Sequence, residues 1–231
     1  MAANALAARR ADATEARIAG LSLPQGAPWA TEARQAALAR LTAMGLPQRR
    51  DEYWRYTDPT TLTATEAATS DPALRDEGPI FGAVEQLRIV FVDGVFDPDQ
   101  SDPLQMAGLE IERLADVTAK DIHWAKDLLG VLEARGQKPV ERSLAAFNTA
   151  FAADGVVIRA VGRAEKPVAL IYLQDSDASD VMLHHLVKVE PGADVTVLET
   201  GPAAARFSKV MEVDIADGGA FHHVRAQGRA H

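Results

Sequence analysis

Hydrophobic residues in the first third of the chain recur at helical spacing. Between residues 31 and 45 they fall on one stripe of a helix: Ala33, Ala37, Leu38, Leu41 and Met44. Thr31 is suited to cap the start of this helix and Gly45 to end it, with Pro47 just beyond. Because the stripe is mostly alanine and buries little area, we expect the helix to pack against another element.

The pattern changes to strand-like alternation after residue 80. The stretch EQLRIVFVDGVFDP predicts a strand that turns at Asp93-Gly94 into a second, short strand. Residues 58–79 are rich in Thr, Ala, Asp and Pro with weak periodicity, which indicates a connecting region. We therefore expect an N-terminal helical region over residues 1–79 and a mainly β region over residues 80–231.

Two helical stretches are expected to interrupt the β region near residues 117–152. The first, TAKDIHWAKDLLGVL, opens with an approximate capping box at Thr118-x-x-Asp121 and carries apolar residues at helical spacing. The second is a short helix that should stop near Asp154. Its apolar face is formed by Leu144, Phe147 and Phe151.

From Gly155 onward the apolar runs recur at a nearly fixed spacing. Matched positions in the last two runs are 26 or 27 apart in sequence number, with an insertion at the turn, and Ile158 precedes Val187 by 29. Such a strand-turn-strand repeat predicts a β-solenoid, in which each coil covers the open face of its neighbour. Antiparallel hairpins of a sandwich or jelly roll give a similar pattern. The matched pairs are Val187 with Val213, Val189 with Ile215, Ala193 with Ala220 and Val197 with Val224.

Two pairs of adjacent histidines invite a metal-site interpretation. Because successive side chains of a strand point to opposite faces, only one histidine of each pair can face inward. We expect His185 and His222 on the apolar face, and His184 and His223 on the outer face. In the repeat register the two inward rings lie on different strands and do not converge.

A metal site needs three or four donors that converge on one point. The strongest version here is a cupin-like barrel in which two histidines join Glu199 and His231. Such a site would use alternating His-x-His on one face, whereas this chain has His-His. We therefore assign no catalytic, cofactor-binding or metal-ligating residue. A small β-helix or cupin-type metal-dependent enzyme is the alternative interpretation.

Composition narrows the classes of function. The 231 residues include no cysteine, which excludes disulfides, thiolate zinc sites and a cysteine nucleophile. A net charge of −9 without basic clusters disfavours nucleic acid as a partner. The first twenty residues lack an apolar core and carry Asp12 and Glu15, so we expect a cytoplasmic protein and no membrane segment. A glycosidase needs two carboxylates at a fixed separation, and the acidic residues considered for that role are scattered: Glu32, Glu52, Asp97, Asp99 and Asp102.

The segment RRDEYWRYTD, residues 49–58, concentrates aromatic and charged side chains. We expect a buried aromatic anchor with charge-assisted partners, joining the helical and β regions; a recognition surface is the alternative. Arg-x-Glu-x-Trp-Arg-Tyr-Thr, from Arg50 to Thr57, resembles the N-terminal signature of the SufB/SufD family of the Suf iron–sulfur cluster assembly system. FVDGVFDPDQSD is similar to the family's Asn/Asp-Gly-x-Phe segment. The family's LNTAF..DG..I stretch is matched by Asn148, Thr149, Ala150, Phe151, Asp154 and Gly155.

The resemblance implies a right-handed parallel β-helix preceded by a helical region. It also implies a non-enzymatic scaffold that pairs with SufB and engages the SufC ATPase, with an iron–sulfur cluster at the level of the complex and none bound by this chain alone. The helical lead and the absence of cysteine favour the SufD branch. Because the match covers only the N-terminal half of a typical member, we expect an incomplete β-helix that self-associates through its uncapped end.

Overall fold

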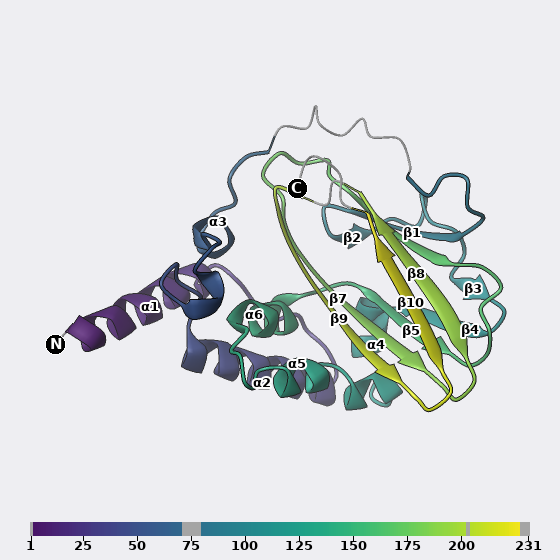
Figure 1. Ribbon diagram of the computed structural model, residues 1–231, viewed down its shortest axis with the longest axis horizontal. Helices are drawn as coiled ribbons and strands as arrows, with labels where there is room; N and C mark the ends of the chain where they lie inside the picture. The colour runs from purple at the N-terminus through teal and green to yellow at the C-terminus, as the bar shows by residue number, and fades with distance from the viewer. Residues whose placement is uncertain (1, 71–79, 202–203, 227–231) are drawn as a thin grey trace.

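The helices lie at the N-terminal side of the molecule and the strands fill the rest (Figure 1). The computed structural model describes residues 2–70, 80–201 and 204–226. The N-terminal part contains α1 (Ala2–Ile18), α2 (Pro28–Met44), the short 3-10 helix η1 (Glu52–Trp54) and α3 (Thr60–Thr63). No helix in these described ranges is both long enough and apolar enough to cross a membrane.

Two five-stranded sheets follow, and from β5 onward successive strands belong alternately to one sheet and to the other. One sheet has the order β10-β8-β6-β1-β2, and the other has the order β3-β4-β5-β7-β9. The first sheet is formed by β1 (Leu87–Val92), β2 (Val95–Phe96), β6 (Val168–Leu173), β8 (Asp194–Thr200) and β10 (Ala220–Arg225). The second is formed by β3 (Gln105–Met106), β4 (Leu109–Arg113), β5 (Val156–Ala160), β7 (Asp180–Val189) and β9 (Arg206–Ile215).

From β5 onward each strand pairs in parallel with the strand two places along the chain. Ile158 lies opposite Val187, and Val187 lies opposite Val213, so both of these predicted pairings are confirmed. The predicted pairing of Val197 with Val224 is wrong, because Val197 lies opposite His223. The turns before β8 and β10 are the same length, residues 190–193 and 216–219, so no residue is inserted.

The principal core lies between the two sheets. Its side chains come from the inward positions of both, among them Ile89, Ile158, Leu170 and Val187, all almost completely buried. Because inward positions alternate along each strand, the core repeats from one pair of strands to the next. The predicted turn after β1 is confirmed, since Asp93 and Gly94 both have positive φ angles of 46° and 80°.

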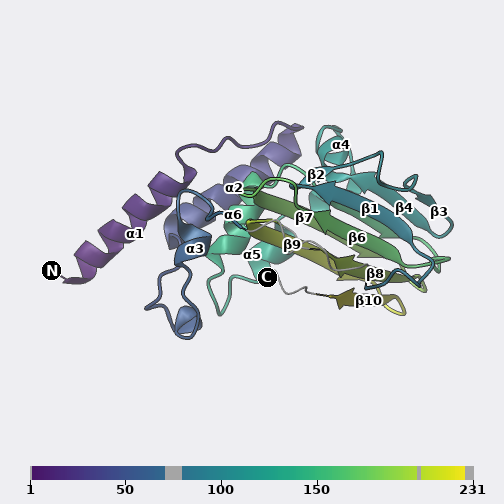
Figure 2. The ribbon, with the colours of Figure 1, turned by 90° about the horizontal axis from the view of Figure 1, so that it is seen from above.

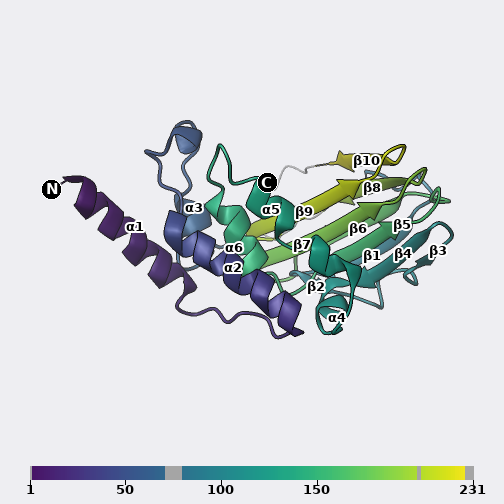
Figure 3. The same cartoon turned by 90° about the horizontal axis from the view of Figure 1, so that it is seen from below.

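Helices cover the outer face of the sheet that contains β5, β7 and β9 (Figure 3). They are inserted between β4 and β5: α4 (Leu114–Thr118), the 3-10 helix η3 (Trp124–Asp127), α5 (Val131–Arg135) and α6 (Ser143–Phe151). α2 packs against α6 through Ala37 and Leu41, as the alanine-rich stripe predicts. α1 extends away from the sheets toward the N-terminal end (Figure 2).

Two helix predictions need correction. Thr31 does not begin α2, because Pro28 occupies its first turn and Pro is favoured there; the predicted end at Gly45 is confirmed by a φ of 68°. The continuous helix predicted from Thr118 is wrong, because Thr118 is the last residue of α4 and two short helices, η3 and α5, follow it. His123 caps η3 through its ring nitrogen, and Gly130, with a φ of 73°, separates η3 from α5. The short helix with Leu144, Phe147 and Phe151 is confirmed as α6.

Candidate functional site

A chain of buried polar side chains runs through the core between the two sheets. It starts at His185 on β7, which is fully buried against Phe91 and Tyr172, as strand parity predicts. The backbone N–H of Val156 donates to His185 Nδ1 at 3.0 Å, so the ring proton is on Nε2. Nε2 faces the Tyr172 hydroxyl at 3.0 Å. Burial lowers the pKa of His185 well below its usual value, and nearby Lys209 adds to this, so the ring is neutral.

Tyr172 carries the chain onward to Glu199 on β8. The phenol is buried, and its hydroxyl is close enough to the Glu199 carboxylate to be affected by its charge. Burial, followed by the negative charge of Glu199, raises the pKa of Tyr172 well above its usual value. Since His185 Nε2 donates to the hydroxyl oxygen, the hydroxyl proton is directed at Glu199, and the network has one consistent direction.

Glu199 is buried and is contacted by three basic side chains. Lys209, from β9 in the opposite sheet, donates to both carboxylate oxygens, at 2.6 Å to Oε2. His223 Nε2 lies 3.3 Å from Oε1, and Arg225 Nε lies 3.8 Å from Oε2. Burial lowers the pKa of Lys209, although the adjacent carboxylate opposes the shift. Glu199 is fully buried, whereas the side chains of His223 and Arg225 are about one third exposed, so the chain leads from the core to the surface at β10.

The basic side chains around Glu199 occupy the carboxylate oxygens that a bound cation would need. A metal ion would have to displace Lys209 from Glu199 and would lie beside His223 and Arg225. Within residues 2–70, 80–201 and 204–226, no three histidine or carboxylate side chains are placed to hold a metal ion. Glu199 and His185 are joined only through Tyr172, and His231 of the cupin-like alternative lies outside the described residues.

The predicted orientation of the second histidine pair is wrong. His223 faces inward beside Glu199, and the side chain of His222 is 63% exposed, near Asp194. The cause is the uniform register of the parallel strands, which places Phe221 over Val195 and His223 over Val197 on the core face. No inserted residue shifts the parity of β10.

His184 faces away from the core, as predicted, but it is buried and not exposed. The helices cover that face, and His184 Nε2 lies 2.8 Å from Glu212 Oε1 on β9. The same carboxylate accepts hydrogen bonds from the backbone N–H groups at the start of α5, at residues 130, 132 and 133. Burial opposes ionisation of Glu212, but His184 and these N–H groups outweigh it and lower its pKa.

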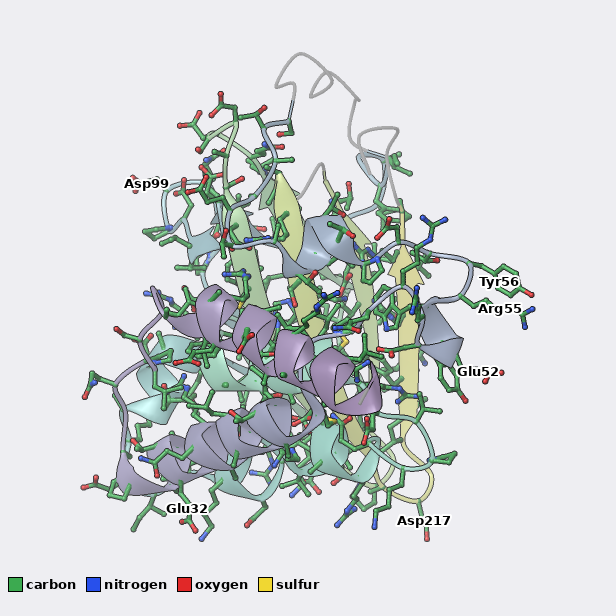
Figure 4. The ribbon with its side chains drawn as sticks, turned by 90° about the vertical axis from the view of Figure 1, so that its left-hand side faces the viewer. Glu32, Glu52, Arg55, Tyr56, Asp99 and Asp217 are labelled. Carbon is green, nitrogen blue, oxygen red and sulfur yellow. The ribbon has the colours of Figure 1, made fainter. Side chains whose placement is uncertain are left out.

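The scattered acidic residues do not form a second site. Figure 4 shows Glu32, Glu52 and Asp99 pointing outward at separate places on the surface. Asp97 accepts hydrogen bonds from the backbone of its own loop, and Asp102 accepts one from Arg88. Asp97 and Asp102 therefore stabilise the local backbone.

Comparison with known proteins shows a likeness to two iron–sulfur cluster assembly proteins. The chain is 28% identical over 177 residues to an iron–sulfur cluster assembly SufBD family protein of Synechocystis sp.; the match covers 72% of this chain and 38% of that protein. It is also 28% identical over 174 residues to the iron–sulfur cluster assembly protein SufD of Escherichia coli, covering 71% and 37%. Over about 70% of its length the chain is thus similar to proteins of the SufB/SufD family. No protein-family model matches it, and it spans less than two fifths of the length of these two SufB/SufD relatives.

The stretch from Asn148 to Gly155, which resembles one SufB/SufD motif, contacts strands of both sheets, including Phe96 of a second such motif. Asn148 on α6 donates to the backbone and hydroxyl oxygens of Ser208 on β9, each at 3.0 Å. Asp154 accepts from Arg113 at 2.8 Å and from the N–H of Phe96 at 3.2 Å. Gly155 leaves no room for a side chain, because an added Cβ would lie 1.9 Å from a backbone oxygen of β7. The roles of these motif residues are therefore structural.

The third SufB/SufD motif, the 49–58 segment, is not the buried anchor that we expected. Tyr53 is 70% exposed and Tyr56 is 90% exposed, while Trp54 is only partly buried. The aromatic rings therefore contribute little to joining the helical and β regions. Glu52, Arg55 and Tyr56 project from the edge of the molecule (Figure 4).

Sequence reasoning missed Tyr172, Lys209 and Arg225. A signal was present for Lys209, because it shares strand parity with Phe207 and Met211, which pack against the core. A lysine at an apolar parity position needs a buried acidic partner. Glu199, on the parity of Val197, was the corresponding carboxylate.

Proposed function

We propose that this chain is a non-enzymatic scaffold component of iron–sulfur cluster assembly. The observation that carries the proposal is the family relationship, since both matched relatives are named as iron–sulfur cluster assembly proteins. The polar chain supports a scaffold role, because its carboxylate is engaged by Lys209 and its histidine by Tyr172. No group in it is left both reactive and accessible in the manner of a catalytic nucleophile.

The partners in this proposal are a SufB homologue and a SufC-type ATPase. These 231 residues contain no cysteine, so in this proposal a partner supplies the thiolate ligands of the iron–sulfur cluster. The cluster then belongs to the complex and not to this chain alone. Because thiols stay reduced in the cytoplasm, we place the assembly there.

The proposed architecture is a right-handed parallel β-helix. Its support is the alternation of strands between two sheets, with β5, β7 and β9 paired in parallel in one and β6, β8 and β10 in the other. β9 and β10 are outer strands of their sheets. Since an outer strand presents unpaired N–H and C=O groups, we propose that the chain self-associates through these strands when no partner is present. A clean, stable monomer in size-exclusion chromatography at high concentration contradicts this part of the proposal.

Anaerobic co-purification tests the scaffold function against a metal-dependent enzyme. The chain is co-expressed with the SufB and SufC homologues of its own organism, and iron and acid-labile sulfide are measured in the complex and in the chain alone. The proposal expects both elements in the complex and neither in the chain alone. Stoichiometric iron in the isolated chain, lost in His185→Ala or Glu199→Gln, would establish the metal-dependent alternative.

A further inference from the structure

A hollow of about 530 Å³, which we call the α6–β9 hollow, lies where the N-terminal helices meet α6 and the outer strand β9. Small-molecule sites typically have a volume of this order and are mostly apolar, with a few polar groups that orient the ligand. The apolar part of the lining includes Leu144 and Phe147 on α6, Met182 on β7 and Phe207 on β9. The α6–β9 hollow therefore has the size and the apolar surface to hold an organic ligand.

The charged side chains that line the hollow are mostly basic. Four basic side chains and one acidic side chain contribute: Arg17, Arg206, Lys209, Arg225 and Asp180. Even when Glu199, the partner of Lys209, is counted with Asp180, four positive charges face two negative ones. The chain as a whole has a net charge of −9, so this positive excess is local. A cleft lined by one sign of charge concentrates ions of the opposite sign, which here are anions.

Both oxygens of the acidic lining residue, Asp180, are already engaged. Arg206 donates to Oδ1 at 2.8 Å and to Oδ2 at 2.5 Å, and Arg17 Nη2 donates to Oδ2 at 2.6 Å. The remaining nitrogen of Arg206 donates to backbone carbonyl oxygens of residues 61 and 64. Asp180 and Arg206 thus hold each other and the segment after α3 in place, and they leave Arg17 as the arginine with unused donors.

Arg17 is buried with hydrogen-bond donors that have no acceptor. Its side chain is 3% exposed, and only Nη2 reaches an acceptor in the described part of the chain. Burial lowers the pKa of Arg17; Asp180 opposes this shift and the nearby charge of Arg206 adds to it. A buried cation whose charge is only partly balanced destabilises the fold, so a second negative charge beside Arg17 would be stabilising.

We propose that the α6–β9 hollow binds a small organic acid, whose carboxylate is held by Arg17 and whose apolar body packs against Leu144, Phe147 and Met182. The planar guanidinium of arginine matches the geometry of a carboxylate, which it can bind through two parallel N–H donors. A cation is disfavoured by the basic lining. The proposal is independent of the proposed function, because the chain should bind the acid with no assembly partner present.

Isothermal titration calorimetry of the full chain with octanoate tests the site. 1-Octanol supplies the apolar body without the charge, and inorganic phosphate supplies negative charge without the apolar body. Arg17→Gln removes the charge and part of the fork, and Ala68→Trp fills the hollow from an exposed position in its lining. Arg10→Gln is the matched control, because Arg10 is on the same helix and also pairs with an aspartate, Asp51, but is not part of the lining. Circular dichroism and melting temperature check that each variant is folded.

The proposal expects the wild type to bind one octanoate per chain, with an affinity that falls as salt rises. It expects Arg17→Gln to weaken this binding by at least about tenfold, Ala68→Trp to abolish it and Arg10→Gln to leave it unchanged. Binding of 1-octanol and of phosphate should each be at least about tenfold weaker than that of octanoate.

Three results would overturn the proposal. The first is a wild type that shows no saturable binding of octanoate. The second is 1-octanol or phosphate binding as tightly as octanoate, since the hollow would then recognise only one half of the ligand. The third is wild-type affinity in Ala68→Trp, which decides the location of the site even if Arg17→Gln does not fold.

Discussion

Replacing Glu212 by alanine is expected to destabilise the fold more than any comparable change to a surface glutamate. Glu212 is 3% exposed and accepts four hydrogen bonds, from His184 Nε2 and from the N–H groups of residues 130, 132 and 133. A buried donor left without an acceptor costs about 1–3 kcal/mol. Because water can reach the half-buried Leu132 end of α5, the four terms will not add fully, and we expect a loss of about 3–5 kcal/mol.

Glu212→Gln separates the charge from the packing. The amide keeps one oxygen, which can serve two of the four donors, but its NH₂ group faces the other two. We therefore expect about half the loss of the alanine variant. Glu110→Ala is the control, since this strand glutamate is 56% exposed and its contact with Arg159 is 3.5 Å, so it should change stability by less than about 0.5–1 kcal/mol.

Urea unfolding measures these losses, and a loss of about 4 kcal/mol moves the midpoint by about 1–2 M. The pH dependence gives an independent check. The folded-state pKa of Glu212 is lowered, so its contribution is present above the unfolded pKa of about 4.3 and is lost as pH falls through the folded value. Stability of the wild type should thus fall more steeply below about pH 5 than that of Glu212→Gln. Equal midpoints for Glu212→Ala and Glu110→Ala would contradict the capping role assigned to Glu212.

Three further changes give distinct results. Gly155→Ala places a Cβ 1.9 Å from a backbone oxygen of β7 and should prevent stable folding. Gly192→Ala is the control, because its Cβ meets open space and its φ of 75° should cost only about 1–2 kcal/mol of folding stability. Circular dichroism and urea titration compare the two variants. Tyr172 is buried with a raised pKa, so ultraviolet titration should show the same phenolate absorbance in wild type and Tyr172→Phe up to the pH at which the protein unfolds. Lys209→Met leaves the Glu199 carboxylate buried without its main partner and should lower the free energy of unfolding by about 3–5 kcal/mol. The double variant Lys209→Met/Glu199→Gln should recover most of this loss. Fully additive losses from the two single changes would count against the pairing.

The repeat and the strand order of the C-terminal part were predictable from the sequence because the core residues alternate regularly. Ile158, Val187 and Val213 occupy equivalent positions on successive parallel strands, and their spacing alone gave the register. The error at β10 came from matching apolar residues only. Val224 was aligned with Val197, whereas the protein places His223 there, because the charge of Glu199 makes a polar inward residue acceptable.

The helical insertion and the polar network were less predictable because both depend on contacts distant in sequence. The start of α5 is capped by Glu212 from a strand much later in the chain, and local propensity does not reveal that contact. His184 looked exposed because parity distinguishes only the two faces of a strand. Parity cannot show that helices from residues 114–151 cover the outer face.

Light scattering coupled to size-exclusion chromatography is the decisive measurement for the scaffold proposal. The purified chain is mixed with the SufB homologue and the SufC-type ATPase of its own organism, and the molar mass of each eluting species is measured. A scaffold of cluster assembly should elute with at least one of them, at a mass that includes the chain, and its own self-associated peak should decrease. Elution of all three proteins at the masses they show alone would contradict the scaffold role.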